Sequence, residues 1–137
     1  MKITFVLRFL LFSAVLFSII ACNKNNDEPI DSDLQDIESL ESYQNLIGDG
    51  VSLVFFHATW CSICRNQRPA VESLMKDNDL SHVFFGEVNY EQAQDIVTFS
   101  NVDGFPTMIF YKDGVEQDRL TGGGHSSAKI KDILEEL

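Results

Sequence analysis

Apolar residues recur along this chain with two different periods, and the change of period divides it into elements. Between residues 33 and 48 they fall three or four positions apart, as on one face of a helix, and Asp33 is placed to cap that helix. Further along, dense apolar runs predict strands and amphipathic segments predict helices. The expected strands are 51–57, 82–89, 107–111 and 115–120, and the expected helices are 33–48, 61–76, 91–101 and a last one that runs from a cap at Ser126 or Ser127 to Leu137.

The predicted order of elements is α-β-α-β-α-β-β-α. Strands separated by helices imply parallel pairing, and the hairpin near the end adds antiparallel strands. We therefore expect an α/β domain over residues 33–137, with a mixed central β-sheet flanked by α-helices. In the helix expected over 91–101, the inward-facing residues should be Ala93, Ile96, Val97 and Phe99.

The first residues have the pattern of an export signal. Lys2 and Arg8 precede an apolar run over 9–21, whose 13 residues are fewer than the ~20 that an ordinary membrane-spanning helix needs. The run ends directly before Cys22, a junction that resembles the lipobox of bacterial lipoproteins, in which the cysteine is acylated and becomes the new N-terminus. An uncleaved anchor and an ordinary cleavage site with an incidental cysteine are the alternatives. We expect 1–21 to be a lipoprotein signal peptide, which places the domain in a bacterial cell envelope, lipid-anchored and facing the periplasm.

The net charge of the chain limits the kinds of partner that the domain can bind. Residues 22–137 carry 8 basic and 21 acidic side chains, a net charge of −13. Phosphate binding depends on Lys and Arg, so nucleic acid is excluded, and electrostatic adhesion to an anionic membrane is disfavoured. Membrane contact is therefore expected through the lipid or a partner. The polar, acidic stretch 23–32 is typical of a flexible tether, so that 22–32 joins the lipid to the domain.

Three cysteines are an odd number for an exported protein. If Cys22 is acylated, Cys61 and Cys64 remain as one matched pair between a buried strand and a helix. Cys61 then lies at a helix N-terminus, where free N–H groups and the dipole favour an anion and lower a thiol pKa. This predicts Cys61 as the nucleophile and Cys64 as the resolving thiol. A zinc site and a purely structural disulfide are the alternatives, but the sequence has neither a second cysteine pair nor histidines at metal-ligand spacing. We predict no metal and no bound cofactor.

Several segments resemble those of the thioredoxin family in residues, order and spacing. They are the active-site segment 54–64 with Trp60-Cys61-Ser62-Ile63-Cys64, Arg68-Pro69 at the family's helix-kinking proline, Gly86-Glu87-Val88-Asn89 in the third strand, Gly104-Phe105-Pro106-Thr107 at the cis-proline loop, Lys112-Asp113-Gly114 at the hairpin turn, and Gly122 at the late glycine of the groove. The similarity spans about 34–137. It implies a thioredoxin-like fold and thiol-disulfide exchange with protein disulfides, together with a redox partner that resets the dithiol.

The resemblance also implies a substrate groove around the cysteines. Pro106 is expected to follow a cis peptide bond and to present the backbone groups of Phe105 to an extended substrate, a turn proline being the alternative. Trp60 is expected to cover the nucleophile, with simple core packing as the alternative. The expected groove residues are Trp60, Ser62, Ile63, Phe105, Pro106 and Gly122.

Several positions depart from the family pattern. Ser62-Ile63 replaces the usual Gly-Pro, which leaves the redox potential open. Phe55 occupies the place of a buried aspartate near the resolving cysteine, and Glu87 lies where many members have lysine. Glu87 is therefore a candidate proton acceptor for the resolving thiol, the alternative being a solvated glutamate at a strand end. His57 is expected to be a packing or groove residue, the alternative being that it tunes the thiolate.

The function expected from these features is the reduction of protein disulfides in the cell envelope by a Cys61–Cys64 dithiol. The first rival is an envelope dithiol oxidase or disulfide isomerase, which runs the same steps in another direction. The second rival is a tethered binding module that uses the groove without turnover, and the intact C-x-x-C motif argues against it.

Overall fold

Five strands form one mixed sheet in the structure, a computed structural model that describes residues 32–137. The strands are β1 Gln35–Asp36, β2 Val51–His57, β3 Val83–Asn89, β4 Thr107–Lys112 and β5 Val115–Thr121, and the helices are α2 Leu40–Ile47, α3 Ser62–Glu72, α4 Gln94–Phe99 and α5 Ser127–Glu135, with 3₁₀ turns at Ser73–Lys76 and Asn78–Leu80. The spatial order is β1-β3-β2-β4-β5. β1, β3 and β2 run parallel, whereas β2–β4 and β4–β5 pair antiparallel. The expected signal peptide, Cys22 and the expected tether up to residue 31 lie outside the described residues.

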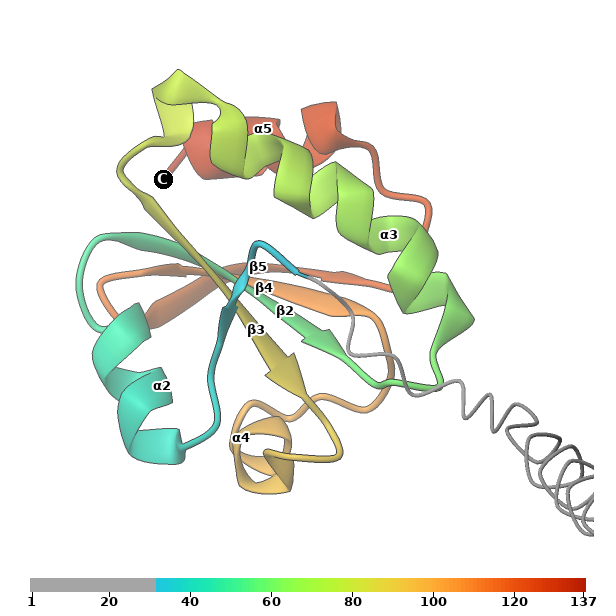
Figure 1. The fold of residues 1–137 in the computed structure, drawn as a ribbon. Helices are drawn as coiled ribbons and strands as arrows, with labels where there is room; N and C mark the ends of the chain where they lie inside the picture. Colours follow the sequence, from blue (N-terminus) through green and yellow to red (C-terminus); the bar gives the residue numbers. More distant parts are fainter. Residues whose placement is uncertain (1–31) are drawn as a thin grey trace, which may run out of the picture.

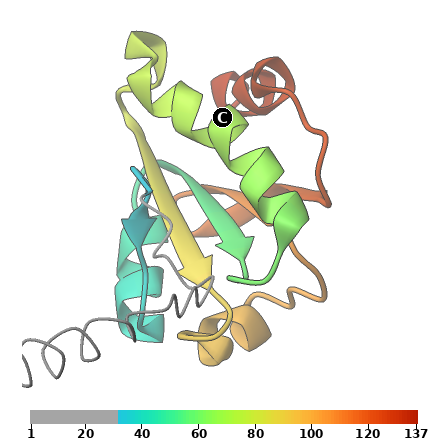
Figure 2. The same ribbon diagram turned by 45° about the vertical axis from the view of Figure 1, so that its right-hand side comes forward.

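Helices cover both faces of the sheet. α3 and α5 lie across one face, and α2 and α4 lie against the other (Figures 1 and 2). The prediction of an α/β fold with a mixed sheet between helices is confirmed. None of the helices within residues 32–137 combines the length and the apolar character needed to cross a membrane.

Each face of the sheet has its own apolar core, and β2 contributes to both. Leu53 and Phe55 pack under α3 and α5, while Val54 and Phe56 pack under α2 and α4. Successive residues of a strand point to opposite faces, so a strand covered on both sides must be apolar at nearly every position. All seven residues of β2 are buried, as the dense run over 51–57 predicts.

The helix predicted over 33–48 is wrong in its first part. Gln35 and Asp36 form β1 beside β3, after a bend at Leu34, and the N–H of Ile37 donates to the carbonyl of Glu87 on β3 at 2.9 Å. Leu34 reaches the core under α3, whereas Ile37 reaches the core on the opposite face. Two residues that lie three positions apart in a strand point to opposite faces of the sheet. When both faces are buried, both residues are apolar, and their spacing then resembles that of apolar residues on one face of a helix. The cap is Ser39, whose Oγ accepts the N–H of Ser42, and not Asp33.

The helix predicted over 91–101 is shorter in the structure. α4 has six residues, and Phe99 at its end is 51% exposed, so the prediction that Phe99 faces inward is wrong. The helix predicted over 61–76 ends as α3 at Glu72 and continues as a 3₁₀ turn. The cap predicted at Ser126 is confirmed, because its Oγ accepts the N–H of Lys129.

Candidate active site

The two cysteines meet where β2 passes into α3. Cys61 and Cys64 form a disulfide, with Cα atoms 5.3 Å apart. Cys61 is the N-cap of α3 and Cys64 lies inside its first turn, as the spacing predicts. Both side chains are buried within the core under α3 and α5. Cys61 is 5% exposed and Cys64 only 1%, so Cys61 is the slightly more accessible of the two.

The cap geometry supplies electrostatic support to Cys61. Its Sγ accepts the backbone N–H of Cys64 at 3.1 Å. The free N–H groups and dipole of a helix N-terminus stabilise negative charge on a capping atom. A thiolate at Cys61 would occupy this position, which is the arrangement expected of the attacking cysteine.

The loop before Cys61 is held by its own contacts. The carboxylate of Glu91 accepts the backbone N–H of Thr59 at 3.3 Å and its hydroxyl at 3.1 Å. The backbone N–H of Cys61 donates to the carbonyl of Ala58 at 3.1 Å. These bonds hold the turn that places Cys61 at the N-terminus of α3.

Exposed apolar side chains surround the disulfide. Trp60 is 68% exposed and Ile63 is 53% exposed. Trp60 stands edge-on to the half-buried Phe105, with ring centroids 6.2 Å apart, and Phe105 also contacts Tyr90. The alternative that Trp60 packs in the core is wrong. Ser62, the first residue of α3, is exposed as well.

The cis-proline loop completes this surface. The Phe105–Pro106 peptide bond is cis, as predicted. The carbonyl of Pro106 accepts the N–H of Gly122 at 2.8 Å, and Gly122 has a φ of +76°, a conformation that favours glycine. A pocket of about 510 Å³ lies beside the loop, lined by Asn101, Asp103, Gly104, Phe105, Thr107, Arg119, Thr121 and Gly122.

The glycine-rich loop at 122–124 is fitted against α3. A Cβ atom at Gly123 would lie 2.5 Å from Cγ2 of Ile63, so any larger residue would displace Ile63. Gln67, buried on α3, holds the end of the loop through two hydrogen bonds to the backbone of His125. Its amide donates to the carbonyl of His125 at 2.8 Å and accepts the His125 N–H at 2.9 Å. Sequence patterns alone left Gln67 without a role.

Glu87 is buried, so the alternative of a solvated strand-end glutamate is wrong. It is 3% exposed, on the face of the sheet that α3 covers. Its Oε2 lies 2.5 Å from Nη1 of Arg68 and 3.1 Å from Nε2 of His57. His57, 4% exposed, stacks on Phe55, and the guanidinium of Arg68 lies over the same ring, 5.2 Å from its centroid. We call Glu87, His57 and Arg68 the buried charge cluster.

The cluster keeps Glu87 ionised. Burial by itself would raise the pKa of this carboxyl, but the His57 contact and the positive charge of Arg68 outweigh it, so the pKa of Glu87 lies below its ordinary value. The Arg68 side chain also contacts the Oγ of Ser32 at 2.5 Å and lies 3.7 Å from Oε1 of Glu72. Arg68 was noted in the sequence only as the neighbour of Pro69. Its position four residues after Cys64, on the same face of the expected helix, is the signal that could single it out.

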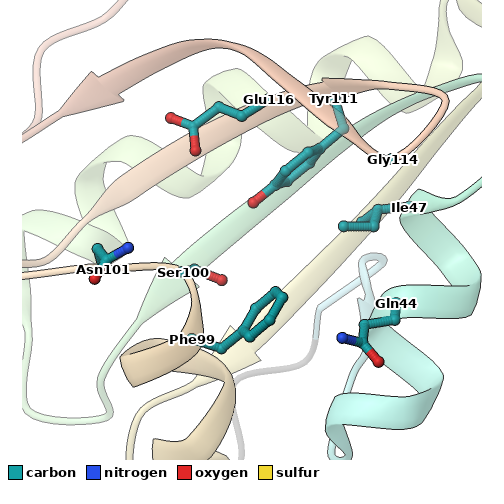
Figure 3. Close-up of a pocket in the computed structure, with 8 residues that line it drawn as sticks. All are labelled: Gln44, Ile47, Phe99, Ser100, Asn101, Tyr111, Gly114 and Glu116. Atoms are coloured by element: carbon teal, nitrogen blue, oxygen red, sulfur yellow. The ribbon is translucent and has the colours of Figure 1, made fainter.

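A second pocket lies on the other face of the sheet, away from the disulfide. It measures about 370 Å³, and its walls come from α2, from α4 and from the β4–β5 hairpin (Figure 3). Phe99 and Tyr111 face it from two sides (Figure 3). Among residues 32–137, no three His, Cys, Asp or Glu side chains gather into a group that could hold a metal ion.

Known proteins share this sequence and fold. The sequence model of the thioredoxin family matches residues 35–136. Thioredoxin from Ictalurus punctatus is 33% identical over 98 residues, which cover 69% of this chain and 92% of that protein. Thioredoxin from Chlamydia caviae is 35% identical over 86 residues, which cover 63% and 82%.

Solved structures agree. Fasciola hepatica thioredoxin is 30% identical, with a TM-score of 0.64 over 75% of this chain and 98% of its own. Oxidised mitochondrial thioredoxin 3 from Saccharomyces cerevisiae, at 23% identity, has a TM-score of 0.68 over 76% of this chain and 95% of its own, and shows the same fold. Because the match extends over the sheet, both helix layers and the disulfide, the chain belongs to the thioredoxin family and is a thiol-disulfide oxidoreductase.

Proposed function

We propose that this protein is a lipid-anchored thioredoxin of the bacterial cell envelope that reduces disulfides in exported proteins. The observation that carries the proposal is the junction of an apolar run of 13 residues with Cys22. Acylation there accounts for the odd cysteine and leaves Cys61 and Cys64 as the redox pair. The domain would then act close to a membrane surface, on substrates that are exported beside it.

The reaction needs no bound cofactor. The Cys61 thiolate attacks one sulfur of a substrate disulfide, forms a mixed disulfide and releases the other substrate sulfur as a thiolate, which takes a proton from water. Cys64 gives up its proton and attacks Sγ of Cys61, which releases the second substrate thiolate. Two electrons pass to the substrate, and the Cys61–Cys64 disulfide remains for a redox partner to reduce.

Substrates are expected to bind as extended segments with apolar residues near the target cysteine. Trp60 and Ile63, which flank the cysteines in the chain, are exposed, and Trp60 contacts the half-buried Phe105. Exposed apolar surface of this kind is typical of a binding site. The net charge of −13 over residues 22–137 also favours neutral or basic substrate segments over acidic ones.

The anchor can be tested in the native host. Cys22→Ser should lose palmitate label and leave the membrane fraction, or accumulate unprocessed. The control is the double variant Cys61→Ser/Cys64→Ser, which should keep both label and membrane location. Label that persists in Cys22→Ser, or that disappears only in the double variant, would remove the basis for the anchor.

The direction of electron flow can be tested by trapping the thiols in intact cells with an alkylating agent. A reductase should be found mainly with Cys61 and Cys64 reduced, because its redox partner keeps supplying electrons. A pair that is mainly oxidised would favour the rival function, a dithiol oxidase. The Cys61–Cys64 equilibrium against a glutathione series then places the reduction potential, which the Ser62-Ile63 dipeptide leaves open.

A further inference from the structure

We propose that Gln67 strengthens the binding of protein substrates, because its side-chain amide fixes the glycine-rich loop at 122–124 to the helix that carries the cysteines. The inference rests on the thiol-disulfide exchange of the family and is independent of whether the chain is lipid-anchored. Gln67 is a positioning residue, since it acts through the loop and not on the sulfur atoms.

The amide of Gln67 pairs with both backbone groups of one residue. Its Nε2 donates to the carbonyl of His125 at 2.8 Å, and its Oε1 accepts the N–H of His125 at 2.9 Å. A side-chain amide offers a donor and an acceptor together, whereas an ionised carboxylate or an apolar side chain cannot form both bonds. Glutamine is mostly exposed in proteins, yet Gln67 is 2% exposed, and the two bonds are what satisfy its polar atoms inside the fold.

A second contact connects the same loop to the same helix. A Cβ atom added at Gly123 would lie 2.5 Å from Cγ2 of Ile63, so the loop backbone lies directly against that side chain. Ile63 and Gln67 are four positions apart on α3, which places them on one face of the helix. The helix therefore holds the loop at two points, by an apolar contact at Gly123 and by the amide pair at His125.

The loop is also connected to the cis-proline loop. The N–H of Gly122 donates to the carbonyl of Pro106 at 2.8 Å, and Gly122 lines the pocket of about 510 Å³ beside that loop. The glycine-rich loop thus joins the two other segments expected in the substrate groove, the start of α3 and the cis-proline loop. Its position decides how these segments meet a bound substrate.

The composition of the loop explains why it needs this support. It contains three consecutive glycines, and φ is +76° at Gly122 and +86° at Gly124. Glycine loses more conformational freedom on ordering than any other residue, so a loop of this kind is costly to hold in one conformation. The ring of His125 contacts the carbonyl of Thr121 at 3.0 Å, but this contact closes the loop on itself and does not connect it to α3. The amide pair makes that connection.

An ordered loop lowers the cost of binding an extended substrate. Association with a flexible surface must first order that surface, and this cost is subtracted from the affinity. A protein substrate is expected to contact the groove on both sides of its disulfide, whereas a small reagent such as hydroxyethyl disulfide offers little beyond its two sulfurs. Loss of the amide pair should therefore weaken the reaction with proteins far more than the reaction with small disulfides.

Gln67→Met tests the pair, because methionine is similar in length to glutamine and forms neither bond. Every protein compared carries Cys22→Ser, so that Cys61 and Cys64 are the only thiols. The reduced full chain is mixed with excess insulin, and its oxidation is followed by the fluorescence of Trp60, the single tryptophan. The half-saturating insulin concentration should rise about tenfold, the cost of ordering one or two groups on binding, while the limiting rate and the rate with hydroxyethyl disulfide should each fall by no more than about twofold.

Two further variants sharpen the test. The matched control is Asn66→Leu, at the neighbouring exposed amide on α3, which should change neither reaction. Gly123→Ala should reproduce the defect from the other contact, because the added methyl group displaces the loop from Ile63. The double variant Gln67→Met/Gly123→Ala should lose little more than the stronger single variant, since both changes release the same loop.

Two outcomes overturn the proposal. If Gln67→Met reduces insulin as efficiently as the protein with Gln67, the amide pair does not contribute to substrate binding. If the reactions with insulin and with hydroxyethyl disulfide slow by the same factor, Gln67 acts on the cysteines or on the stability of α3, and not on the binding of protein substrates.

A measurement on the protein with Gln67 in place covers the case in which Gln67→Met does not fold. Backbone NMR relaxation should give the exposed Gly123 and Gly124 order parameters close to the value of about 0.85 that is typical of rigid backbone. Order parameters below about 0.6 would show that the loop moves in spite of the amide pair, and they would overturn the proposal as well.

Discussion

Under α2 and α4 the sheet buries hydroxyl groups, whereas under α3 and α5 it buries charges. On the first face the hydroxyls of Tyr43 and Tyr111 lie 2.5 Å apart, and Ser100 donates to Tyr43 at 2.9 Å. Each of these hydroxyls has a protein partner. A network of this kind is satisfied and neutral, and it contributes to stability without offering a group that titrates near pH 7.

The charged face is satisfied only in part. Both ring nitrogens of His57, the Nε and Nη2 of Arg68 and the Oε2 of Glu87 are buried without hydrogen-bond partners among residues 32–137. The Glu87 oxygen does lie within ion-pair distance of Arg68 and His57. Buried polar groups without hydrogen-bond partners lower stability. They lie in the layer that also contains the disulfide, and the hydroxyl network lies across the sheet from it. The charged face thus has more unsatisfied polar atoms than the hydroxyl face, on which Ser52 Oγ is the one such atom among residues 32–137.

The largest difference between the faces should appear in activity. Cys61→Ser should abolish reduction of insulin disulfides, because no second thiol is placed to attack. Cys64→Ser should attack once and stall as a mixed disulfide, which non-reducing electrophoresis detects. Tyr43→Phe, on the opposite face, should retain turnover at temperatures where it is folded. Trapping of substrate by Cys61→Ser instead would reverse the roles of the two cysteines.

The next largest effect should be on the stability of the charged face. Arg68→Met removes the cation beside Glu87 and leaves a buried carboxylate unpaired, which costs about 3–5 kcal/mol of unfolding free energy. Lys76→Met is the control, because Lys76 pairs with Asp33 at the exposed surface, where an ion pair contributes about 1 kcal/mol or less. Urea unfolding of the oxidised proteins measures both. Equal losses would mean that the cluster at Glu87 is hydrated.

Structural features that depend on residues near one another in the chain could be predicted from the sequence. The strand pattern of 51–57, the cap at Cys61 and the cis bond before Pro106 each depend on a few neighbouring residues and were predicted correctly. β1 could not be predicted, because two residues form a strand only through pairing with β3 some fifty positions later. Helical spacing and a strand between two cores look alike over so short a segment.

The burial of Glu87 also depends on contacts between residues far apart in the sequence. A glutamate near the end of a strand is ordinarily solvated, and nothing within β3 indicates otherwise. Arg68 on α3 and His57 on β2 enclose it only once both elements pack against β3. Motifs located the reacting cysteines, but the groups that surround them are fixed by contacts distant in sequence.

A smaller effect is expected from the hydroxyl face. Tyr43→Phe leaves the hydroxyls of Tyr111 and Ser100 without their partner, which costs about 1–3 kcal/mol. The double variant Tyr43→Phe/Tyr111→Phe should lose less than twice the single value, because both members of the short contact are then gone. Thermal or urea unfolding gives each value. A single variant as stable as wild type would show that water replaces the missing hydroxyl.

The smallest effects should come from pH, and the two faces should respond at opposite ends of the scale. The folded-state pKa of Glu87 lies below its ordinary value of 4.5, so its contribution is complete above that pH and is lost as the pH falls through the folded value. The pKa of Tyr43 is raised above its ordinary 10.0 by burial, so its contribution is complete below pH 10 and is lost as the pH rises. The stability difference between wild type and Glu87→Gln should therefore shrink only in acid, and that between wild type and Tyr43→Phe only in alkali.

Protonating Glu87 removes a charge but leaves the side chain in place, which is why the acid effect should be smaller than that of Arg68→Met. Urea midpoints of the three proteins at pH 3, 7 and 10.5 provide the test, and a Glu87→Gln difference that grows in acid would contradict the ionised cluster.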